Sequence, residues 1–214
     1  MKILQSIFQE SCGPIAAIIG GAKISTKLKL IKSLSTKVNY LIVGGAMANN
    51  ILQAREISVG TSLVENDIHE AFQHCENIIL PQDVITSSNA DSSDIHTCDV
   101  RYVPPAEAIF DIGPASVIKI KNILQECKTV IWNGPLGFFE KDRFSKATRE
   151  VANAIVHLTE RKKIRSIIGG GDSIFAINKF GISHKNFTHV STAGGAFLEW
   201  LENQGLSCLR TLEG

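Results

Sequence analysis

Apolar residues in this chain gather in short runs that alternate with longer stretches of mixed polarity. A short run that is apolar throughout is typical of a strand covered on both faces, as in a parallel sheet. Five short apolar runs lead into a glycine-containing turn: Ile15–Ile19, which is apolar throughout, and Tyr40–Val43, Thr129–Trp132, Ser166–Ile168 and Thr188–Ser191, which include polar residues. A further run, Asn77–Leu80, ends at Pro81. The pattern predicts strands at these positions.

The stretches between the runs carry apolar residues at helical spacing. They predict helices at Ser25–Leu34, Ala46–Ala54, Asp67–Cys75, Ser116–Leu124, Lys146–Leu158, Ser173–Phe180 and Ala196–Glu202, after a short helix around Ile3–Phe8. Strand and helix alternate, and no Pro/Gly/Ser-rich linker is long enough to divide the chain. We therefore predict a single α/β domain with a doubly wound, mostly parallel sheet and helices on both faces, a Rossmann-like three-layer sandwich.

One segment departs from this alternation. Between Val84 and Pro105 the periodicity weakens, and residues 87–94 are a polar excursion rich in serine and aspartate. Such composition is typical of a surface loop, and we expect some β structure around it.

Composition narrows the classes of function. The chain has 214 residues and a formal net charge of +1, so no overall field favours nucleic acid or an anionic membrane. Its apolar runs fall far short of the ~18 residues that a membrane helix needs. Five scattered cysteines without a C-x-x-C pair argue against a disulfide framework or a zinc site. With no secretory signal pattern at Met1, we expect a cytoplasmic protein.

The glycine turns are the candidate ligand sites, because open α/β sheets bind ligands at the carboxyl ends of their strands. The chain has neither a P-loop nor a G-x-G-x-x-G fingerprint. Gly20-Gly21-Ala22-Lys23 instead permits close backbone approach, and Lys27 follows one helical turn later on the same face. The alternative is a tight turn with two solvated lysines.

Other candidate residues lie in the later turns, and most of them admit two interpretations. Asp172, after Gly169-Gly170-Gly171, either caps the next helix or holds Mg²⁺ beside a bound phosphate. Asn133-Gly134 is a common hairpin dipeptide, but its flanks do not alternate as paired strands do. Glu140 is either a surface carboxylate or an acceptor for ribose hydroxyls. Thr192-Ala193-Gly194-Gly195 would open a helix N-terminus toward a phosphoryl group.

Taken in order, these turns resemble those of the phosphoglycerate kinase family. The motifs are Gly20-Gly21-Ala22-Lys23, Gly44-Gly45-Ala46-Met47-Ala48, Asp111-Ile112-Gly113-Pro114, Trp132-Asn133-Gly134-Pro135-Leu136-Gly137, Phe139-Glu140, Gly169-Gly170-Gly171-Asp172-Ser173 and Ser191-Thr192-Ala193-Gly194-Gly195-Ala196. The resemblance covers nearly the whole chain, but only the carboxyl-terminal, nucleotide-binding half of the family. It implies that residues 1–12 are a remnant of the interdomain helix and that residues 13–214 form the nucleotide-binding domain. The amino-terminal half, which binds phosphoglycerate through a basic patch, is absent from this sequence.

The resemblance implies a reversible phosphoryl transfer between 1,3-bisphosphoglycerate and MgADP, which gives 3-phosphoglycerate and MgATP. It implies that Lys23 and the amides of Gly194 and Gly195 stabilise the phosphoryl group in transfer, and that Asp172 holds Mg²⁺. The implied nucleotide contacts are Gly21, Ala22, Lys27, Gly44, Gly45, Gly113, Asn133, Pro135, Leu136, Glu140, Gly170, Gly171, Asp172 and Ser173. Among these, Lys27 would bind the phosphates and Glu140 the ribose hydroxyls.

Because the half that binds the acid substrate is missing, we expect this chain alone to bind nucleotide as a monomer with negligible turnover. Three positions depart from the usual family pattern. Thr26 stands where many members carry aspartate, and Ala46 and Ala193 stand where a third glycine is usual. Two other functions stay open: another α/β phosphotransferase or sugar-nucleotide enzyme, and a non-catalytic module that binds adenine nucleotide.

Overall fold

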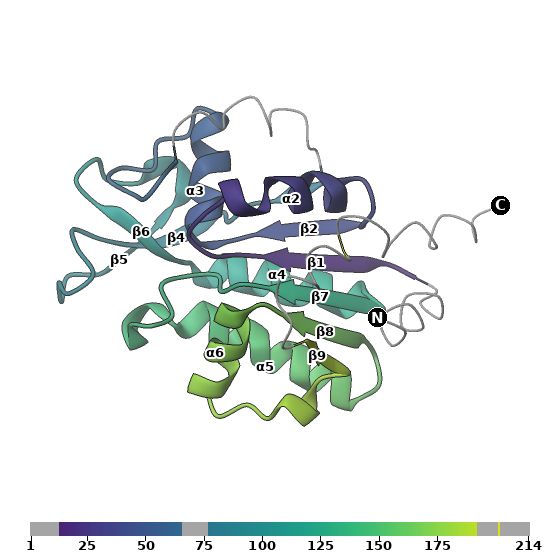
Figure 1. The fold of residues 1–214 in the computed structure, drawn as a ribbon. Coiled ribbons are helices and arrows are strands. Elements are labelled where there is room, and N and C mark those ends of the chain that lie inside the picture. Colours follow the sequence, from purple (N-terminus) through teal and green to yellow (C-terminus); the bar gives the residue numbers. More distant parts are fainter. Residues whose placement is uncertain (1–12, 66–76, 192–200, 202–214) are drawn as a thin grey trace.

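The central sheet has six strands, and every pair of neighbours in it runs parallel (Figure 1). A computed structural model describes residues 13–65, 77–191 and 201. The strands lie in the order β3-β2-β1-β7-β8-β9. Their bounds are Ile15–Ile19 for β1, Tyr40–Val43 for β2, Ile78–Ile79 for β3, Thr129–Asn133 for β7, Arg165–Gly169 for β8 and His189–Ser191 for β9. The predicted strands and the mostly parallel, doubly wound sheet are confirmed.

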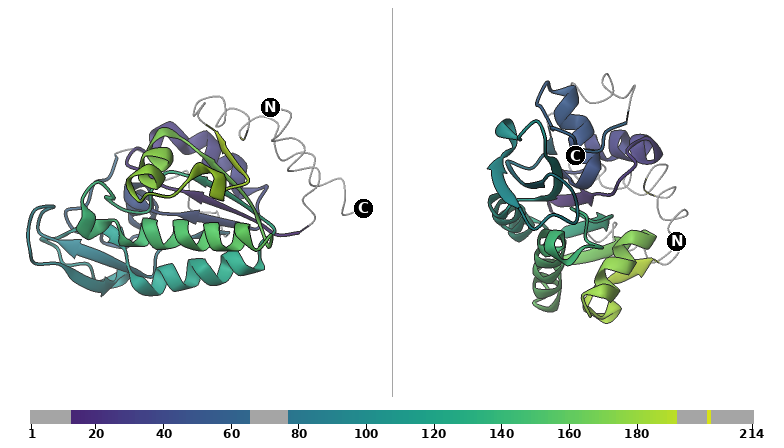
Figure 2. Two further views of the ribbon diagram at one scale, coloured as in Figure 1. Left: turned by 90° about the horizontal axis from the view of Figure 1, so that it is seen from below. Right: turned by 90° about the vertical axis from the view of Figure 1, so that its left-hand side faces the viewer.

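Helices cover both faces of this sheet (Figures 1 and 2). Helices α2 and α3 lie on one face, and α4 and α5 on the other. The helices are α2 (Leu28–Ser35), α3 (Gly45–Ala54), α4 (Pro114–Glu126), α5 (Lys146–Glu160) and α6 (Gly171–Lys179), with 3-10 turns η1 (Ser25–Lys27), η4 (Asp142–Phe144) and η5 (His184–Asn186). The predicted helices at 3–8, 67–75 and 196–202 lie outside the described residues, except for Leu201.

The buried core follows from the alternation of side chains along each strand. In β1, Ala17 and Ile19 join the cluster beneath α2 and α3, while Ala16 and Ile18 join the cluster beneath α4 and α5. Successive strand residues point to opposite faces, so a strand that is covered on both sides must be apolar throughout. Each fully buried large aliphatic side chain contributes roughly 1.5–3 kcal/mol. This is why the central strand β1 appears in the sequence as an unbroken apolar run.

A second, three-stranded antiparallel sheet lies beyond the carboxyl ends of the parallel strands (Figure 1). Its order is β5-β4-β6, with β4 at Asp83–Ser87, β5 at His96–Asp99 and β6 at Ala108–Ile112; η3 (Val100–Tyr102) follows β5. The polar excursion predicted as a loop forms the turn between β4 and β5, as expected. The strand β6 was not predicted. This sheet has its own small apolar cluster, built around Val84, Val100 and Val103.

The register of the parallel strands aligns the turns that follow them. Ile19 is paired with Val43 on one side and with Asn133 on the other, and Asn133 is paired in turn with Gly169. The ladder continues into the turns, because the Gly20 N–H donates to the Asn133 carbonyl at 2.9 Å. Asn133-Gly134 thus ends a parallel strand and does not form a hairpin. The glycine turns after β1, β2, β7 and β8 lie in a row along one edge.

None of the helices that the structure describes is both long and apolar enough to span a membrane.

Candidate functional site

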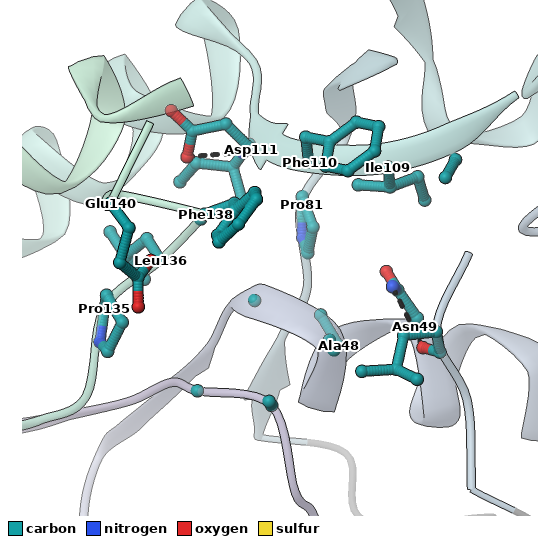
Figure 3. A pocket seen from close by; sticks show the side chains of 18 of the residues that line it. Ala48, Asn49, Pro81, Ile109, Phe110, Asp111, Pro135, Leu136, Phe138 and Glu140 are labelled. Carbon is teal, nitrogen blue, oxygen red and sulfur yellow. Dashed lines mark hydrogen bonds between the residues drawn. The ribbon is translucent and has the colours of Figure 1, made fainter. Parts of the chain in front are cut away.

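A cavity of about 350 Å³ lies between the row of glycine turns and the antiparallel sheet (Figure 3). One wall comes from the turns after β1 and β2 and from the start of α3, and another from the segment after β7. The strand β6 closes the far side. The cavity is lined by Gly21, Ala22, Gly45, Ala46, Ala48, Asn49, Leu63, Pro81, Ala108, Ile109, Phe110, Asp111, Ile112, Pro135, Leu136, Gly137, Phe138, Glu140 and Asp172.

The cavity is apolar inside and polar toward one end. Phe110 and Phe138 approach it from one side and Ala48 of α3 from the other (Figure 3). The exposed carboxylates Glu140 and Asp172 stand in its wall. An apolar slot with a few convergent polar groups is the usual form of a small-molecule site, and a flat aromatic ligand would fit between such walls.

Lys27 lies at the turn after β1. Its Nζ donates to the Gly20 carbonyl at 2.9 Å. A Cβ added to Gly134 would lie 3.1 Å from the same Nζ. The ammonium of Lys27 therefore lies between the turn after β1 and the turn after β7. Burial lowers the pKa of Lys27 to about 8, and the nearby carboxylate of Asp172 acts in the opposite direction. The structure thus brings a cation and a carboxylate together from turns that are far apart in the sequence.

The turn after β8 is locked to its neighbour by side chains. Gly170 has φ +94°, and a Cβ there would lie 2.7 Å from the Asn133 amide nitrogen. That amide donates to the Gly169 carbonyl at 2.9 Å, and the buried Ser173 hydroxyl accepts from the Gly134 N–H at 2.6 Å. Asn133 and Ser173 therefore fix the shape of the turn, and Asp172 lies exposed at the start of α6.

The segment after β7 is fixed from three directions. The Leu136 N–H donates to the Thr148 hydroxyl of α5 at 3.0 Å. The Leu136 carbonyl accepts from the Gly45 N–H at 2.8 Å. The Phe138 N–H donates to the Phe110 carbonyl of β6 at 2.7 Å. The cavity wall is thus tied to α5, to α3 and to the antiparallel sheet, which makes it a preformed surface.

Comparison with known proteins decides the family. A model of the family described as phosphoglycerate kinase matches residues 1–204. The phosphoglycerate kinase of Novosphingobium aromaticivorans is 42% identical over 224 residues, and that of a Chelativorans strain is 43% identical over 223. The chain belongs to the phosphoglycerate kinase family.

Solved structures of the family agree with this fold. The phosphoglycerate kinase of Coxiella burnetii is 36% identical with a TM-score of 0.87, and that of Pyrococcus horikoshii is 26% identical with a TM-score of 0.77. Each comparison covers 99% of this chain, but only 56% and 55% of those chains. Likewise, all of this chain aligns with 56% of the Novosphingobium and Chelativorans enzymes. The chain spans about half the length of the relatives that it matches.

The residues implied by the phosphoglycerate kinase resemblance differ in where they lie relative to the cavity. Those that line the cavity are Gly21, Ala22, Gly45, Pro135, Leu136, Glu140 and Asp172. Those beside the lined surface, in the turns that frame it, are Lys27, Gly44, Asn133, Gly170, Gly171 and Ser173. Gly194 and Gly195 lie outside the described residues. Lys23 is exposed and does not line the cavity.

At two of the implied glycines, Gly113 and Gly44, there is no room for a side chain. A Cβ on Gly113 would collide with the carboxylate of Asp83, whose main-chain oxygen accepts from the Gly113 N–H at 2.8 Å. A Cβ on Gly44 would come within 2.5 Å of the Leu136 side chain. Neither glycine lines the cavity. Gly44 packs against Leu136, which does line it, and Gly113 packs against Asp83. Their proximity to adenine stays a prediction.

Sequence reasoning missed the far wall of the cavity, which comes from Ile109, Phe110, Phe138, Asn49, Leu63 and Pro81. It quoted Asp111 in a motif but gave it no role. The Asp111 Oδ1 accepts from the Ile112 N–H at 2.9 Å, and its Oδ2 accepts from the Ala147 N–H at 3.1 Å. Burial raises the pKa of Asp111 to about 8, and the two backbone donors oppose that shift. A carboxylate inside an otherwise apolar strand was the signal that could have found it.

The departures from the family pattern are locally accommodated where the structure describes them. The Thr26 hydroxyl donates to the Lys23 carbonyl at 2.8 Å, so it stabilises the turn instead of adding a carboxylate. Ala46 lines the cavity at the second position of α3. Ala193 lies outside the described residues.

Proposed function

We propose that this chain is the nucleotide-binding half of a phosphoglycerate kinase. In this role it binds MgADP or MgATP and takes part in the reversible transfer of a phosphoryl group between 1,3-bisphosphoglycerate and ADP. One observation carries the proposal: Gly21, Glu140 and Asp172, implied by resemblance from three distant parts of the sequence, stand in the wall of a single cavity.

The apolar slot is the proposed site of the adenine ring. Leu136 and Phe138 on one side and Ala48 on the other offer flat contact without a hydrogen-bonding group that would need a partner. Glu140 lies beside Pro135 (Figure 3), and in this proposal its carboxylate would accept hydrogen bonds from the two ribose hydroxyls. A carboxylate has two acceptor oxygens, which suits a pair of adjacent hydroxyl groups.

The phosphates extend from the ribose toward Lys27 and the start of α6. The first N–H groups of a helix have no partner within the helix, so they attract an anion. Lys27 adds a positive charge to this end of the site. Mg²⁺ would be held by Asp172 and would neutralise charge on the nucleotide phosphates. Among the described residues no group of three or more His, Cys, Asp or Glu side chains could hold a metal ion. In this proposal nucleotide phosphates and water would complete the coordination of Mg²⁺.

In the reaction, an oxygen of the ADP β-phosphate attacks the phosphorus of the acyl phosphate. The bond between that phosphorus and the carboxyl oxygen breaks, and 3-phosphoglycerate leaves as a carboxylate. Catalysis of this type depends on positioning and charge stabilisation. By family resemblance, Lys23, Gly194 and Gly195 would stabilise the group in transfer. The acid substrate binds to the family's other half, so the isolated chain would bind nucleotide without turning over.

The direct test is calorimetric titration of the purified chain with MgADP. We expect saturable one-site binding that weakens by about tenfold or more in Asp172→Ala and when magnesium is withheld. Glu126→Ala is the matched control, since Glu126 accepts from the Tyr40 hydroxyl at the opposite edge of the sheet. Absence of binding by a folded chain would overturn the proposal, and appreciable kinase turnover by the chain alone would overturn its second part.

The pH dependence of the same titration gives a second readout. Lys27 must be protonated to attract a phosphate, and its pKa in the free chain is about 8. Affinity for ADP is therefore expected to fall as the pH rises through about 8. Lys27→Met should bind weakly at all pH values and lose this dependence. An unchanged affinity in Lys27→Met would contradict the assigned role.

A further inference from the structure

Lys179, the last residue of α6, holds the segment that carries Glu140. Its Nζ donates to the main-chain oxygens of Phe139 at 2.9 Å and Glu140 at 2.7 Å, and it pairs with Asp142 Oδ1 at 2.8 Å. An ammonium has three N–H donors, and each has an acceptor here. The Lys179 side chain is only 25% exposed, in contrast to the 89% of Asp142, and its contact with the Phe139 carbonyl is partly buried.

These contacts fix the backbone on both sides of Glu140. The Phe139 carbonyl belongs to the peptide that precedes Glu140, and the Glu140 carbonyl belongs to the peptide that follows it. With both peptides held, the direction in which the Glu140 side chain leaves the backbone is also held. An aromatic contact adds to this, because the buried Phe139 ring meets Phe175 of α6 edge-on at a centroid distance of 5.5 Å.

The same helix starts at the other end of the candidate site. Asp172 lies in the first turn of α6 and Lys179 at its end, about 10 Å apart along the axis at ~1.5 Å per residue. A single rigid element thus carries the proposed phosphate and metal end at its start and grips the Glu140 segment at its end. Any shift of α6 relative to β7 would move both ends of the site together.

From this geometry we infer that Lys179 is a positioning residue for ribose recognition: it sets the Glu140 carboxylate for the two ribose hydroxyls and ties that carboxylate to the helix at the phosphate end. The inference rests on the proposed function, since it requires the ligand to be a nucleotide with its ribose at Glu140. Lys179 itself does not line the cavity and acts through the backbone that it holds.

The test compares ADP with 2′,3′-dideoxy-ADP, both with magnesium, in the wild-type chain and in variants. Wild type should prefer ADP by about tenfold, the value of a charge-assisted hydrogen-bond contact. Lys179→Met should lose most of this preference by weakening ADP while leaving the dideoxy analogue within about threefold. Lys179→Arg should recover part of the preference. Lys185→Met, in η5 and outside the cavity lining, is the matched control and should keep it.

A double variant separates positioning from a general loss of stability. Glu140→Ala should abolish the preference, and adding Lys179→Met to it should change the ratio no further, because the two residues act through one contact. If Lys179→Met does not fold, Asp142→Asn provides the test, since it removes only the exposed partner. It should reduce the preference in the same direction by a smaller factor.

The outcomes distinguish this inference from the proposed function. A folded wild-type chain that does not bind ADP would overturn the proposed function. If wild type binds ADP and the dideoxy analogue equally, or if Lys179→Met weakens both by the same factor, nucleotide binding stands and the positioning role of Lys179 is overturned.

Discussion

The two sheets of this molecule are built on opposite principles. The parallel sheet is buried on both faces, and strands such as β1 and β7 are buried along their whole length. The antiparallel sheet β5-β4-β6 has a small apolar cluster, and polar side chains pair across its more exposed surface. His96 lies between Asp94 and Glu107 at 3.0 and 2.8 Å, and the Thr86 hydroxyl donates to Glu107 at 2.5 Å. The cavity lies between a region with a large apolar core and a region with a small apolar cluster and partly exposed polar contacts.

The two sheets contribute different parts of the candidate site. The parallel sheet supplies rigid turns whose positions are fixed by strand register, which suits groups that must meet phosphate with little tolerance. The antiparallel sheet supplies side chains, such as Ile109 and Phe110, that close the slot over a ring. Substitutions in the first region should therefore disturb stability and binding together, and substitutions in the second should disturb them less.

The largest effect is expected where backbones of the parallel region touch. A Cβ on Gly20 would collide with the Pro135 carbonyl, so Gly20→Ala must displace the turn and should cost about 3 kcal/mol. Gly171→Ala is the control, because nothing lies within 4 Å of the added carbon; its stability should change by less than about 0.5 kcal/mol. Urea unfolding measures both. Equal stability of the two variants would show that the turn is not tightly packed.

A matched pair of valines compares the two cores directly. Val130 of β7 and Val84 of β4 are both fully buried, so the same substitution removes the same atoms. Val130→Ala should cost about 2–3 kcal/mol and Val84→Ala about 1–2 kcal/mol, because the larger cluster around Val130 collapses less readily into the space. The measurement is the unfolding free energy from denaturant titration. A larger loss in Val84→Ala would reverse the comparison.

The smallest effect is a pH signature of the antiparallel sheet. The hydrogen bond to Glu107, followed by the charge of Asp94, raises the pKa of His96 above its ordinary value near 6.5. This contribution is fully present below the unfolded pKa and is lost as the pH rises through the folded pKa. Stability of wild type should therefore fall slightly above pH 6.5, whereas His96→Gln should lack that fall. Thermal unfolding across pH 5 to about 9 tests this, and an identical slope in both proteins would contradict it.

The strands of the parallel sheet could be predicted from the sequence because burial on both faces requires a run of neighbouring apolar residues. A run such as Ile15–Ile19 indicates a strand covered by helices on both faces, and a turn with glycine is expected where such a strand leads into the next helix. The strand β6 shows no such pattern, since Ala108, Ile109 and Phe110 are only partly buried and their partners are far away in the chain. Its place depends on docking against α3 and the 135–138 segment, which no local pattern encodes.

The candidate site divides in the same way. Residues fixed by turn geometry, such as Gly45 and Asp172, were predicted from motifs and line the cavity. The contacts of Lys179 were not predicted, because they are made to main-chain oxygens that carry no sequence signal. Gly113 packs its backbone against Asp83 and does not line the cavity, and its place beside the ligand stays a prediction.

The buried Trp132 gives this site a built-in optical reporter. Its side chain is 0% exposed, and its indole N–H donates to the Gly134 carbonyl at 2.6 Å. The Gly134 N–H also donates to the Ser173 hydroxyl oxygen, and the Lys27 Nζ lies 3.1 Å from where a Cβ on Gly134 would stand. A ligand that moves Lys27 or the start of α6 is therefore expected to disturb Gly134 and the indole that is hydrogen-bonded to it. In a Trp200→Phe background, intrinsic fluorescence could follow the filling of the cavity without a label, on the millisecond scale of a stopped-flow mixer.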